Sequence, residues 1–217
     1  MSTEQMLKSA LWYRNKKDYS VIPVGDDKRP LIKWLQYQNE KPSIEQIQEW
    51  WGSKFEGANI GIVTGKISNL TVVDIDSQAG LQAIEEITPE NMITPIANSP
   101  SGGEHRYFQY EDGIGNAVRF LSDCDIRSEG GYIIAPPSQN GRGKYSWQIS
   151  IANTQIASFP EAYKYALNKA TVDYSNIVYS RGEGFKGLQR ASYIYQKIIK
   201  LKTTRGIMHF FILQMLS

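Results

Sequence analysis

The sequence predicts a mixed α/β (α+β) fold, in which an antiparallel sheet follows an opening of alternating helices and strands. Two observations predict it. Apolar residues recur at helical spacing in the N-terminal part, and from residue 93 onward short β-rich runs are separated by Gly, Pro and Asn. Because 41% of the 217 residues are hydrophobic, the chain can bury a sizeable core.

The N-terminal part predicts helices and strands in alternation. Residues 3–16 predict a helix, and Ser20–Val24 predicts a short strand. Ser43, followed three residues later by Gln46, has the form of a capping box and marks the start of a second helix. The remaining elements expected before residue 90 are strands over Asn59–Val63 and Leu70–Ile75, separated by a Gly65-Lys66 turn, and a helix over Gln78–Ile87.

The rest of the chain predicts a mostly antiparallel sheet followed by helices. Strands are expected over residues 93–98, 105–110, 116–121, 124–127, 131–135 and 144–149. Helices are then expected over Phe159–Lys169 and Lys186–Lys202. We therefore predict a body over residues 1–170 and a short helical tail over residues 171–217.

The composition excludes several classes of site. Lys and Arg (24) nearly balance Asp and Glu (22), so the net charge of +2 neither demands nor excludes a nucleic-acid partner. Cys124 is the single cysteine, and with only His105 and His209 the chain has no zinc-ligand set. The N-terminus lacks a secretory signal and the apolar run Gly206–Leu216 is too short to span a bilayer, so we expect a cytoplasmic protein without a membrane partner.

An Asp-x-Asp pair, Asp74 and Asp76, ends an apolar strand. Strand alternation puts both residues on one face, with Cα atoms about 6.5 Å apart. Two such carboxylates near a core would repel each other, and a bound divalent cation is the usual resolution. The alternative is a strand end whose acids are solvated or cap the helix that begins at Ser77.

A glycine turn runs into a strand over Ser99–Phe108. Gly102 and Gly103 can adopt conformations closed to other residues and let backbone N–H groups approach an anion. Ser101 and His105 could add side-chain donors. The alternative is a hairpin turn followed by a strand histidine with a local partner.

Asp125 and Arg127 form a third candidate pair. In a strand they share one face, while Cys124 and Ile126 occupy the other. The acid could hold a metal and the base a phosphate. The alternative is a cross-strand ion pair on a solvated face, which contributes little to stability.

In combination these features favour chemistry on a triphosphate. Such chemistry needs carboxylates for two cations, and cationic or N–H donors for the phosphates. One metal would lower the pKa of an attacking 3′-hydroxyl, and the second would stabilise the charge that develops on the leaving pyrophosphate. The pattern therefore favours phosphodiester bond formation.

The order Asp-x-Asp, Ser-Gly-Gly-x-His, Asp-x-Arg, Gly-Gly-Tyr and Ala-Pro-Pro-Ser resembles the primase-polymerase (Prim-Pol) domains of the archaeo-eukaryotic primase superfamily, which occur in plasmid and phage replication proteins. The likeness extends to Lys28–Trp34, Ala58–Gly65 and Tyr145–Trp147, and covers roughly residues 18–148. Several motifs in one order are far more specific than any of them alone.

The resemblance implies a two-part Prim-Pol fold whose catalytic half is an RRM-like antiparallel sheet flanked by helices. It also implies that Asp74, Asp76 and Asp125 are catalytic ligands for Mg²⁺ or Mn²⁺, and that His105 contacts the triphosphate of the incoming nucleotide. The other residues implied at the nucleotide site are Ser101, Gly102, Gly103, Arg127 and Lys28.

The activity that the resemblance implies is that of a DNA-directed nucleotidyltransferase, a DNA polymerase with primase activity, in the replication of a mobile element. Its partners would be a single-stranded or primed DNA template and dNTPs or NTPs. The chain has no P-loop motif, so we expect any helicase either to be another chain or to have been removed by truncation. Priming in certain relatives also needs a helical domain after the catalytic body, and about 50 residues follow Lys169 here, so polymerisation is the firmer expectation.

The predicted tail offers basic residues that could neutralise phosphates and two tyrosines that could stack on bases. They are Lys186, Arg190, Lys197, Lys200, Lys202 and Arg205, with Tyr193 and Tyr195. The alternative is an amphipathic helix with a solvated basic face. For Trp34, Trp50, Trp51 and Trp147 we expect places in the core or in the wall of a cleft.

Two other functions use similar residues. One is a non-catalytic DNA-binding replication initiator on the same fold, against which the intact set of Asp74, Asp76, His105 and Asp125 argues. The other is a metal-dependent phosphohydrolase, which usually recruits more histidines than the two found here.

Overall fold

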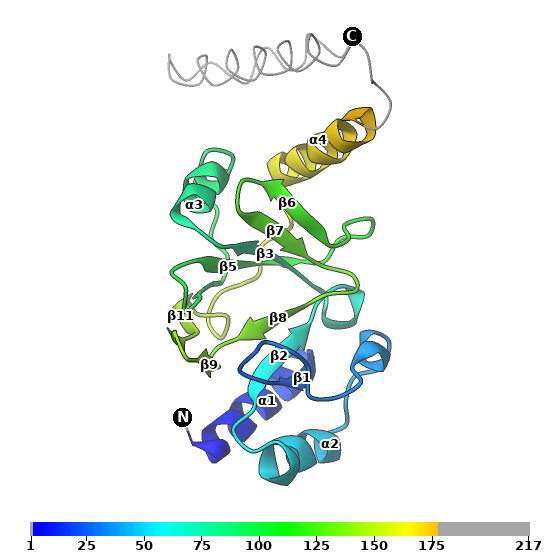
Figure 1. Ribbon diagram of the computed structural model, residues 1–217, viewed down its shortest axis with the longest axis vertical. Coiled ribbons are helices and arrows are strands. Elements are labelled where there is room, and N and C mark those ends of the chain that lie inside the picture. The colour runs from blue at the N-terminus through cyan, green and yellow to red at the C-terminus, as the bar shows by residue number, and fades with distance from the viewer. Residues whose placement is uncertain (1, 178–217) are drawn as a thin grey trace. The chain divides into compact units, whose positions relative to one another are not determined.

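The computed structural model describes residues 2–177, with side chains as far as residue 170. Within this part the chain forms four α-helices and two main antiparallel sheets, which confirms the predicted mixed α/β fold (Figure 1). The helices are α1 (Thr3–Lys17), α2 (Ile44–Glu49), α3 (Gln78–Glu85) and α4 (Glu161–Ile177), with short helical turns η1 (Leu35–Gln38), η2 (Trp50–Lys54) and η3 (Lys66–Ser68). The strands are β1 (Ser20–Val24), β2 (Asn59–Val63), β3 (Leu70–Ile75), β4 (Ile96–Asn98), β5 (Glu104–Gln109), β6 (Ala117–Leu121), β7 (Cys124–Arg127), β8 (Tyr132–Ala135), β9 (Gln139–Asn140), β10 (Gly143–Lys144) and β11 (Ser146–Ile149).

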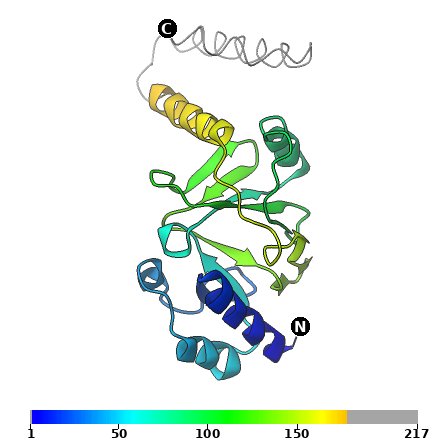
Figure 2. The same cartoon turned by 180° about the vertical axis from the view of Figure 1, so that it is seen from behind.

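A three-stranded sheet with the order β1-β2-β8 forms the N-terminal layer. Every residue of β1 and β2 is buried, which explains why these strands are continuous apolar runs rather than alternating ones. Helix α1 packs on this sheet, as seen from behind in Figure 2, and contributes Met6, Ala10 and Tyr13 to the core. The predicted capping box of α2 is present, with Ser43 and Gln46 each bonding the other's backbone N–H.

The six-stranded sheet has the order β11-β4-β5-β3-β7-β6, so β3 lies between β5 and β7. Residues directly opposite in an antiparallel pair share a face, and successive residues alternate. The face that carries Val72 and Asp74 is called the site face, and the face that carries Val73 and Ile75 is called the back face. The succession β3-α3-β4-β5, with β7 returning beside β3, is a ferredoxin-like arrangement of the kind expected for an RRM-like sheet.

The two faces pack against different layers. Near the start of β3 the site face joins the core of the three-stranded sheet through Leu70, Val72 and Tyr107. The back face is covered by α3 and α4, which contribute Ile84 and Tyr163 to a second buried cluster. Because β3 is covered on both faces, its apolar residues alternate between two cores.

Several predicted boundaries are correct and others are wrong. The strands over Asn59–Val63, Leu70–Ile75 and 124–127 lie where they were predicted. The strand predicted over 93–98 is confined to β4, with Ile93 67% exposed and Pro95 unable to donate to a ladder. The run predicted over 144–149 divides between β10 and β11. The helix predicted from Phe159 begins at Glu161, since Phe159 packs in the back-face core, and it extends beyond Lys169.

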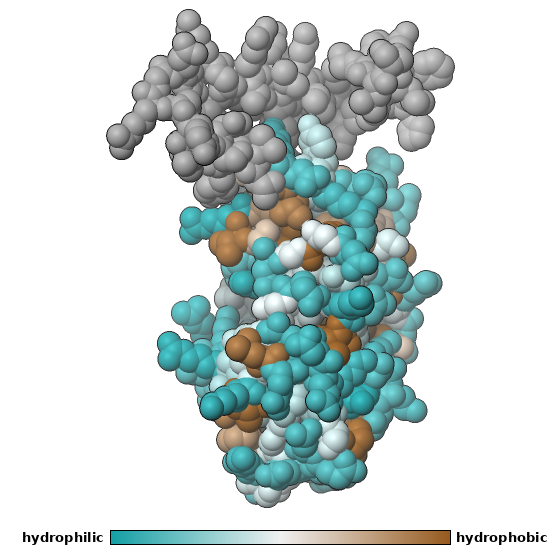
Figure 3. All heavy atoms as spheres, turned by 90° about the vertical axis from the view of Figure 1, so that its right-hand side faces the viewer, coloured by the Kyte–Doolittle hydropathy of each residue, from teal (hydrophilic) through white to brown (hydrophobic). Residues whose placement is uncertain are grey.

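The described surface is largely hydrophilic on the face shown in Figure 3, where apolar side chains form small scattered groups. None of the helices within residues 2–177 is both long enough and apolar enough to cross a membrane. Trp50 and Trp51 are core residues, as predicted. The predicted helix over Lys186–Lys202, its basic and aromatic residues, and the apolar run 206–216 lie outside the described residues, and the domain boundary at residue 170 stays a prediction.

Candidate active site

Three predicted site residues lie side by side on the site face. Asp74, on the central strand β3, is directly opposite His105 of β5 and directly opposite Asp125 of β7. Directly opposite residues in an antiparallel pair have Cβ atoms about 5 Å apart and project from the same face. The register therefore brings two carboxylates and an imidazole together from three strands.

Asp74 is bound from both sides. The Nε2 atom of His105 lies 3.2 Å from Oδ1 of Asp74, and Nε of Arg127 lies 3.8 Å from Oδ2. Burial alone would raise the pKa of Asp74, but the hydrogen bond and charge of His105, with the charges of Arg127 and Lys28, outweigh it and hold the pKa below its ordinary value. Asp74 is thus kept ionised.

His105 is 5% exposed, and its other nitrogen, Nδ1, is buried without a hydrogen-bond partner among the described residues. Its ring lies 5.6 Å from that of Tyr145. Nδ1 is therefore closed to a ligand, and the other nitrogen, Nε2, contacts Asp74.

Asp125 and Arg127 share the site face, as predicted, and they bond each other along one strand rather than across strands. Nη2 of Arg127 donates to Oδ2 of Asp125 at 2.8 Å. Oδ1 of Asp125 accepts the backbone N–H of Arg119, also at 2.8 Å. The pair is half-buried, so it is not the solvated surface pair of the alternative interpretation.

Asp76 follows directly after β3 and is exposed. It does not cap α3, because the side chain of Ser77 accepts the Gly80 N–H and holds that role. Although Asp76 is exposed, partial burial of its carboxyl group, and then the charges of Asp74 and Asp125, raise its pKa. The charges of Asp74 and Asp125 therefore favour the protonated form of Asp76.

The Ser99–Gly103 turn is stabilised from within. The N–H groups of Gly102 and Gly103 donate to the carbonyl and to the hydroxyl of Ser99, at 3.1 and 3.2 Å. Gly102 has a φ of +87°, and a Cβ on Gly103 would lie 2.0 Å from the carbonyl oxygen of Ile75. The two glycines are therefore explained by a left-handed turn and by close packing on the end of β3.

A cavity of about 450 Å³ lies between β8 and the site face. Its lining includes six of the predicted site residues: Lys28, Asp74, Asp76, Ser101, His105 and Arg127. Asp125, Gly102 and Gly103 are absent from the lining; Asp125 adjoins it through Arg127, and the glycines support the turn that carries Ser101. Trp34 belongs to the cavity wall, in keeping with one of the two places expected for it.

No sequence pattern points to Asn116, which lines the same cavity. Its Oδ1 accepts the backbone N–H of Ser128 at 2.8 Å, which fixes the amide so that Nδ2 is the end left for a ligand. A Cβ on Gly131 would lie 2.5 Å from that Oδ1, so Gly131 makes room for it. Tyr132 adds a second wall residue, and its hydroxyl donates to the Lys28 carbonyl at 3.0 Å.

The acidic residues are of the chemical type that binds a hard divalent cation, but their side chains are not arranged to coordinate one in this structure. Within residues 2–170, no three His, Cys, Asp or Glu side chains are arranged as they stand to hold one ion. Asp74 and Asp125 are instead drawn to Arg127. Burial, and then the charges of Asp74 and Asp125, raise the pKa of Asp76, and carboxylate oxygens are ligands that suit Mg²⁺ or Mn²⁺.

Comparison with known proteins agrees with this geometry. Residues 10–162 match the family model described as "Prim-Pol: Bifunctional DNA primase/polymerase, N-terminal". This range includes all of the cavity residues. No curated protein matches the chain. The match extends over more than half of the sequence, and the chain therefore belongs to the Prim-Pol family of primase/polymerase-type nucleotidyltransferases.

Proposed function

We propose that this chain is a metal-dependent DNA primase/polymerase that extends a 3′-hydroxyl with nucleotides chosen by a DNA template. One observation carries the proposal. Asp74 lies between His105 and Asp125 on one face of the sheet, and this face opens into a cavity that also holds Asp76, Lys28 and Arg127. Acids for cations and bases for phosphates therefore share one site.

Asp74, Asp76 and Asp125 would hold the divalent cations, Mg²⁺ or Mn²⁺. When bound, these ions would lower the pKa of the attacking 3′-hydroxyl and stabilise negative charge on the leaving pyrophosphate. Arg127 shares the charge of Asp74 and Asp125 in the structure described here, so it is suited to keep the acids close together without a cation.

The nucleotide's triphosphate would be bound by the cavity's donors. Lys28 and Arg127 supply positive charge, and Ser101 and His105 supply a hydroxyl and an N–H on the β5 side. Because Nδ1 of His105 is buried, a phosphate oxygen would have to bind Nε2, where it would compete with Asp74. Gly102 and Gly103 would act through the shape of the turn.

The family membership supports a role in DNA replication, and the resemblance of the motifs to plasmid and phage proteins supports a mobile element as its setting. We propose a single-stranded or primed DNA template and dNTPs or NTPs as the substrates, residues 1–170 as the catalytic domain, and residues 171–217 as a helical tail.

Incorporation of labelled nucleotides with Mn²⁺ or Mg²⁺, on a primed template and in parallel on an unprimed single strand, tests the function. Products on both templates support a primase-polymerase, and extension of the primer alone supports a polymerase whose priming element lies elsewhere. Failure on both by a folded protein refutes the proposal and favours the non-catalytic initiator. Hydrolysis without incorporation favours a phosphohydrolase.

A further inference from the structure

The hairpin formed by β9 and β10 lies at the rim of the cavity and carries two basic side chains that the proposed chemistry does not use. Residues 138–146 contain Arg142 and Lys144 and no acidic residue. Residues 141–144 are all exposed. Within the described part of the chain neither Arg142 nor Lys144 forms an ion pair with a carboxylate. Arg106, Arg127 and Lys164 each form one.

The base of this hairpin is fixed. The buried Ser138 accepts the N–H of Ile60 through its hydroxyl at 2.9 Å, and its carbonyl accepts the N–H of Tyr145 at 2.8 Å. The N–H of Gln139 donates to Oδ1 of Asn59, also at 2.8 Å. Three hydrogen bonds therefore hold the two ends of the hairpin to β2 and to a tyrosine of the cavity wall.

The tip of the hairpin lies beside the serine turn. A Cβ on Gly143 would lie 3.7 Å from Cβ of Pro100, whose neighbours Ser99 and Ser101 line the cavity. The N–H of Arg142 donates to Oδ1 of Asn140 at 2.9 Å, which closes the turn. Arg142 and Lys144 thus stand next to the cavity without lining it.

This position fits a long anion that leaves the cavity better than it fits the nucleotide. In the proposed function the triphosphate would be bound by Lys28 and Arg127, which line the cavity. A template strand continues past the site, and each of its phosphates can be neutralised by an exposed Arg or Lys. From this placement, and resting on the proposed function, we propose that the β9–β10 hairpin binds the phosphate backbone of the single-stranded DNA template through Arg142 and Lys144.

Binding of a fluorescent single-stranded oligonucleotide to the full chain, measured over a range of KCl concentrations, tests the inference. The variant R142Q/K144Q removes two charges, so the slope of log K against log salt should decrease by about 1 to 2 and the affinity at low salt should fall about 10-fold. The matched control K16Q/K54Q removes the same charge from α1 and η2, and should leave the slope close to that of the wild type. Nucleotide affinity should be unchanged in both variants.

An unchanged slope in R142Q/K144Q, or an equal change in the control, would overturn the inference. So would a loss of nucleotide affinity without a loss of DNA affinity, because the two bases would then belong to the nucleotide site. Failure of the proposed function looks different: DNA binding would keep its dependence on Arg142 and Lys144 while no nucleotide is incorporated. A wild-type protein that incorporates nucleotides normally, and whose DNA binding ignores the hairpin, refutes the inference alone.

Discussion

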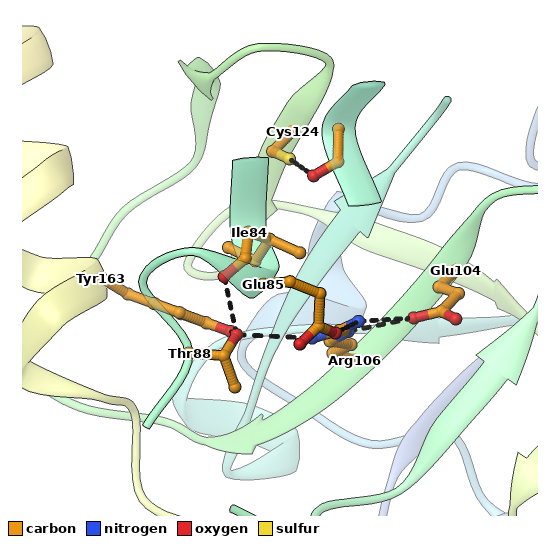
Figure 4. A network of polar contacts seen from close by, with 8 residues as sticks. Ile84, Glu85, Thr88, Glu104, Arg106, Cys124 and Tyr163 are labelled. Atoms are coloured by element: carbon orange, nitrogen blue, oxygen red, sulfur yellow. Dashed lines mark hydrogen bonds and ion pairs between the residues drawn. The ribbon is translucent and has the colours of Figure 1, made fainter. Parts of the chain in front are cut away.

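His105 and Arg106 are neighbours on β5, equally buried at 5% exposure, and they project to opposite faces of the six-stranded sheet. On the back face the guanidinium of Arg106 lies among Glu104, Glu85 and Thr88, and the Thr88 hydroxyl bonds that of Tyr163 at 2.7 Å (Figure 4). On the site face His105 has one bond at 3.2 Å, to Asp74, and one nitrogen without a partner among the described residues.

The difference separates a structural charge from a functional one. Arg106 ties β5 to α3 directly and to α4 through Thr88, and its charge is matched by Glu85 and Glu104. A buried ion that is paired and hydrogen-bonded in this way is not available to a ligand, and removing one partner would leave the other charge uncompensated. On the site face Asp74 and Asp125 pair with Arg127, whereas Asp76 has no ion-pair partner within the described residues, and its pKa is raised by burial and then by the charges of Asp74 and Asp125. Such incomplete compensation is typical of a site that binds ions.

The largest expected effect is on the site face. Replacing Asp74 and Asp76 by Ala should lower nucleotide incorporation by at least about 100-fold, because it removes cation ligands and leaves the apolar cores intact. Primer extension and the melting temperature should be measured on the same preparation. A double variant that extends a primer at the wild-type rate would show that the active site is elsewhere.

The same substitution on the two faces should separate stability from activity. Arg106→Gln should reduce the free energy of unfolding by about 2–3 kcal/mol, since it leaves Glu104 without its partner, while the folded fraction keeps its activity. Arg127→Gln, at a half-exposed position, should reduce activity with a much smaller loss of stability. Urea unfolding and primer extension should be measured on both variants. A loss of activity in Arg106→Gln together with a large loss of stability in Arg127→Gln would contradict the comparison.

His105→Asn should mainly weaken nucleotide binding, by about 10-fold, because one hydrogen bond to a charged group is lost. Tyr107→Phe is the matched control, since Tyr107 lies two residues away on the same face and its buried hydroxyl has no partner among the described residues. Apparent nucleotide affinity, from incorporation rates over a range of nucleotide concentrations, is the readout. An affinity unchanged in His105→Asn would remove this residue from the site.

The smallest expected effect is on stability, which the charges of Asp74 and Asp76 should change in opposite directions. Stability is measured with a chelator present, so that no divalent cation is bound. Asp74 has a lowered pKa, so its ionised form stabilises the fold above its unfolded-state pKa, and this stability is lost as pH falls through the folded-state pKa. Asp76 has a raised pKa, so the native state binds more protons and stability falls as pH rises through its folded-state pKa.

At neutral pH, Asp74→Asn should therefore lower the melting temperature by about 2–4 °C, and Asp76→Asn should raise it by about 1 °C. The gain of Asp76→Asn should vanish in acid, where the wild-type carboxyl is protonated as well. Shifts of the same sign in both variants would mean that the carboxylates do not repel one another.

The sequence was most informative where pattern and partner are local. The buried strand that carries Asp74, the capping box of Ser43 and Gln46, and the shared face of Asp125 and Arg127 all follow from alternation or short spacing, and the structure confirms them. Membership of the family also followed from the order of the motifs.

The sequence was least informative where a residue's role depends on partners far along the chain. Arg106 bonds Glu85, 21 positions away, and Asn116 is oriented by Ser128, 12 positions away, so neither spacing forms a pattern. The sequence also suggested that Gly102 and Gly103 offer N–H groups to an anion, whereas in the structure Ser99 accepts both. Competition within a turn becomes visible only in three dimensions.

We propose that the acids of the site face bind divalent cations. A Mn²⁺ titration followed by electron paramagnetic resonance is the most direct test of this binding. The wild type and Asp74→Asn/Asp76→Asn should be compared at equal concentration, after circular dichroism has shown that both are folded. The wild type should remove the signal of free Mn²⁺, and the variant should leave it largely unchanged. Equal binding by both proteins, or no binding by the wild type, would contradict the account.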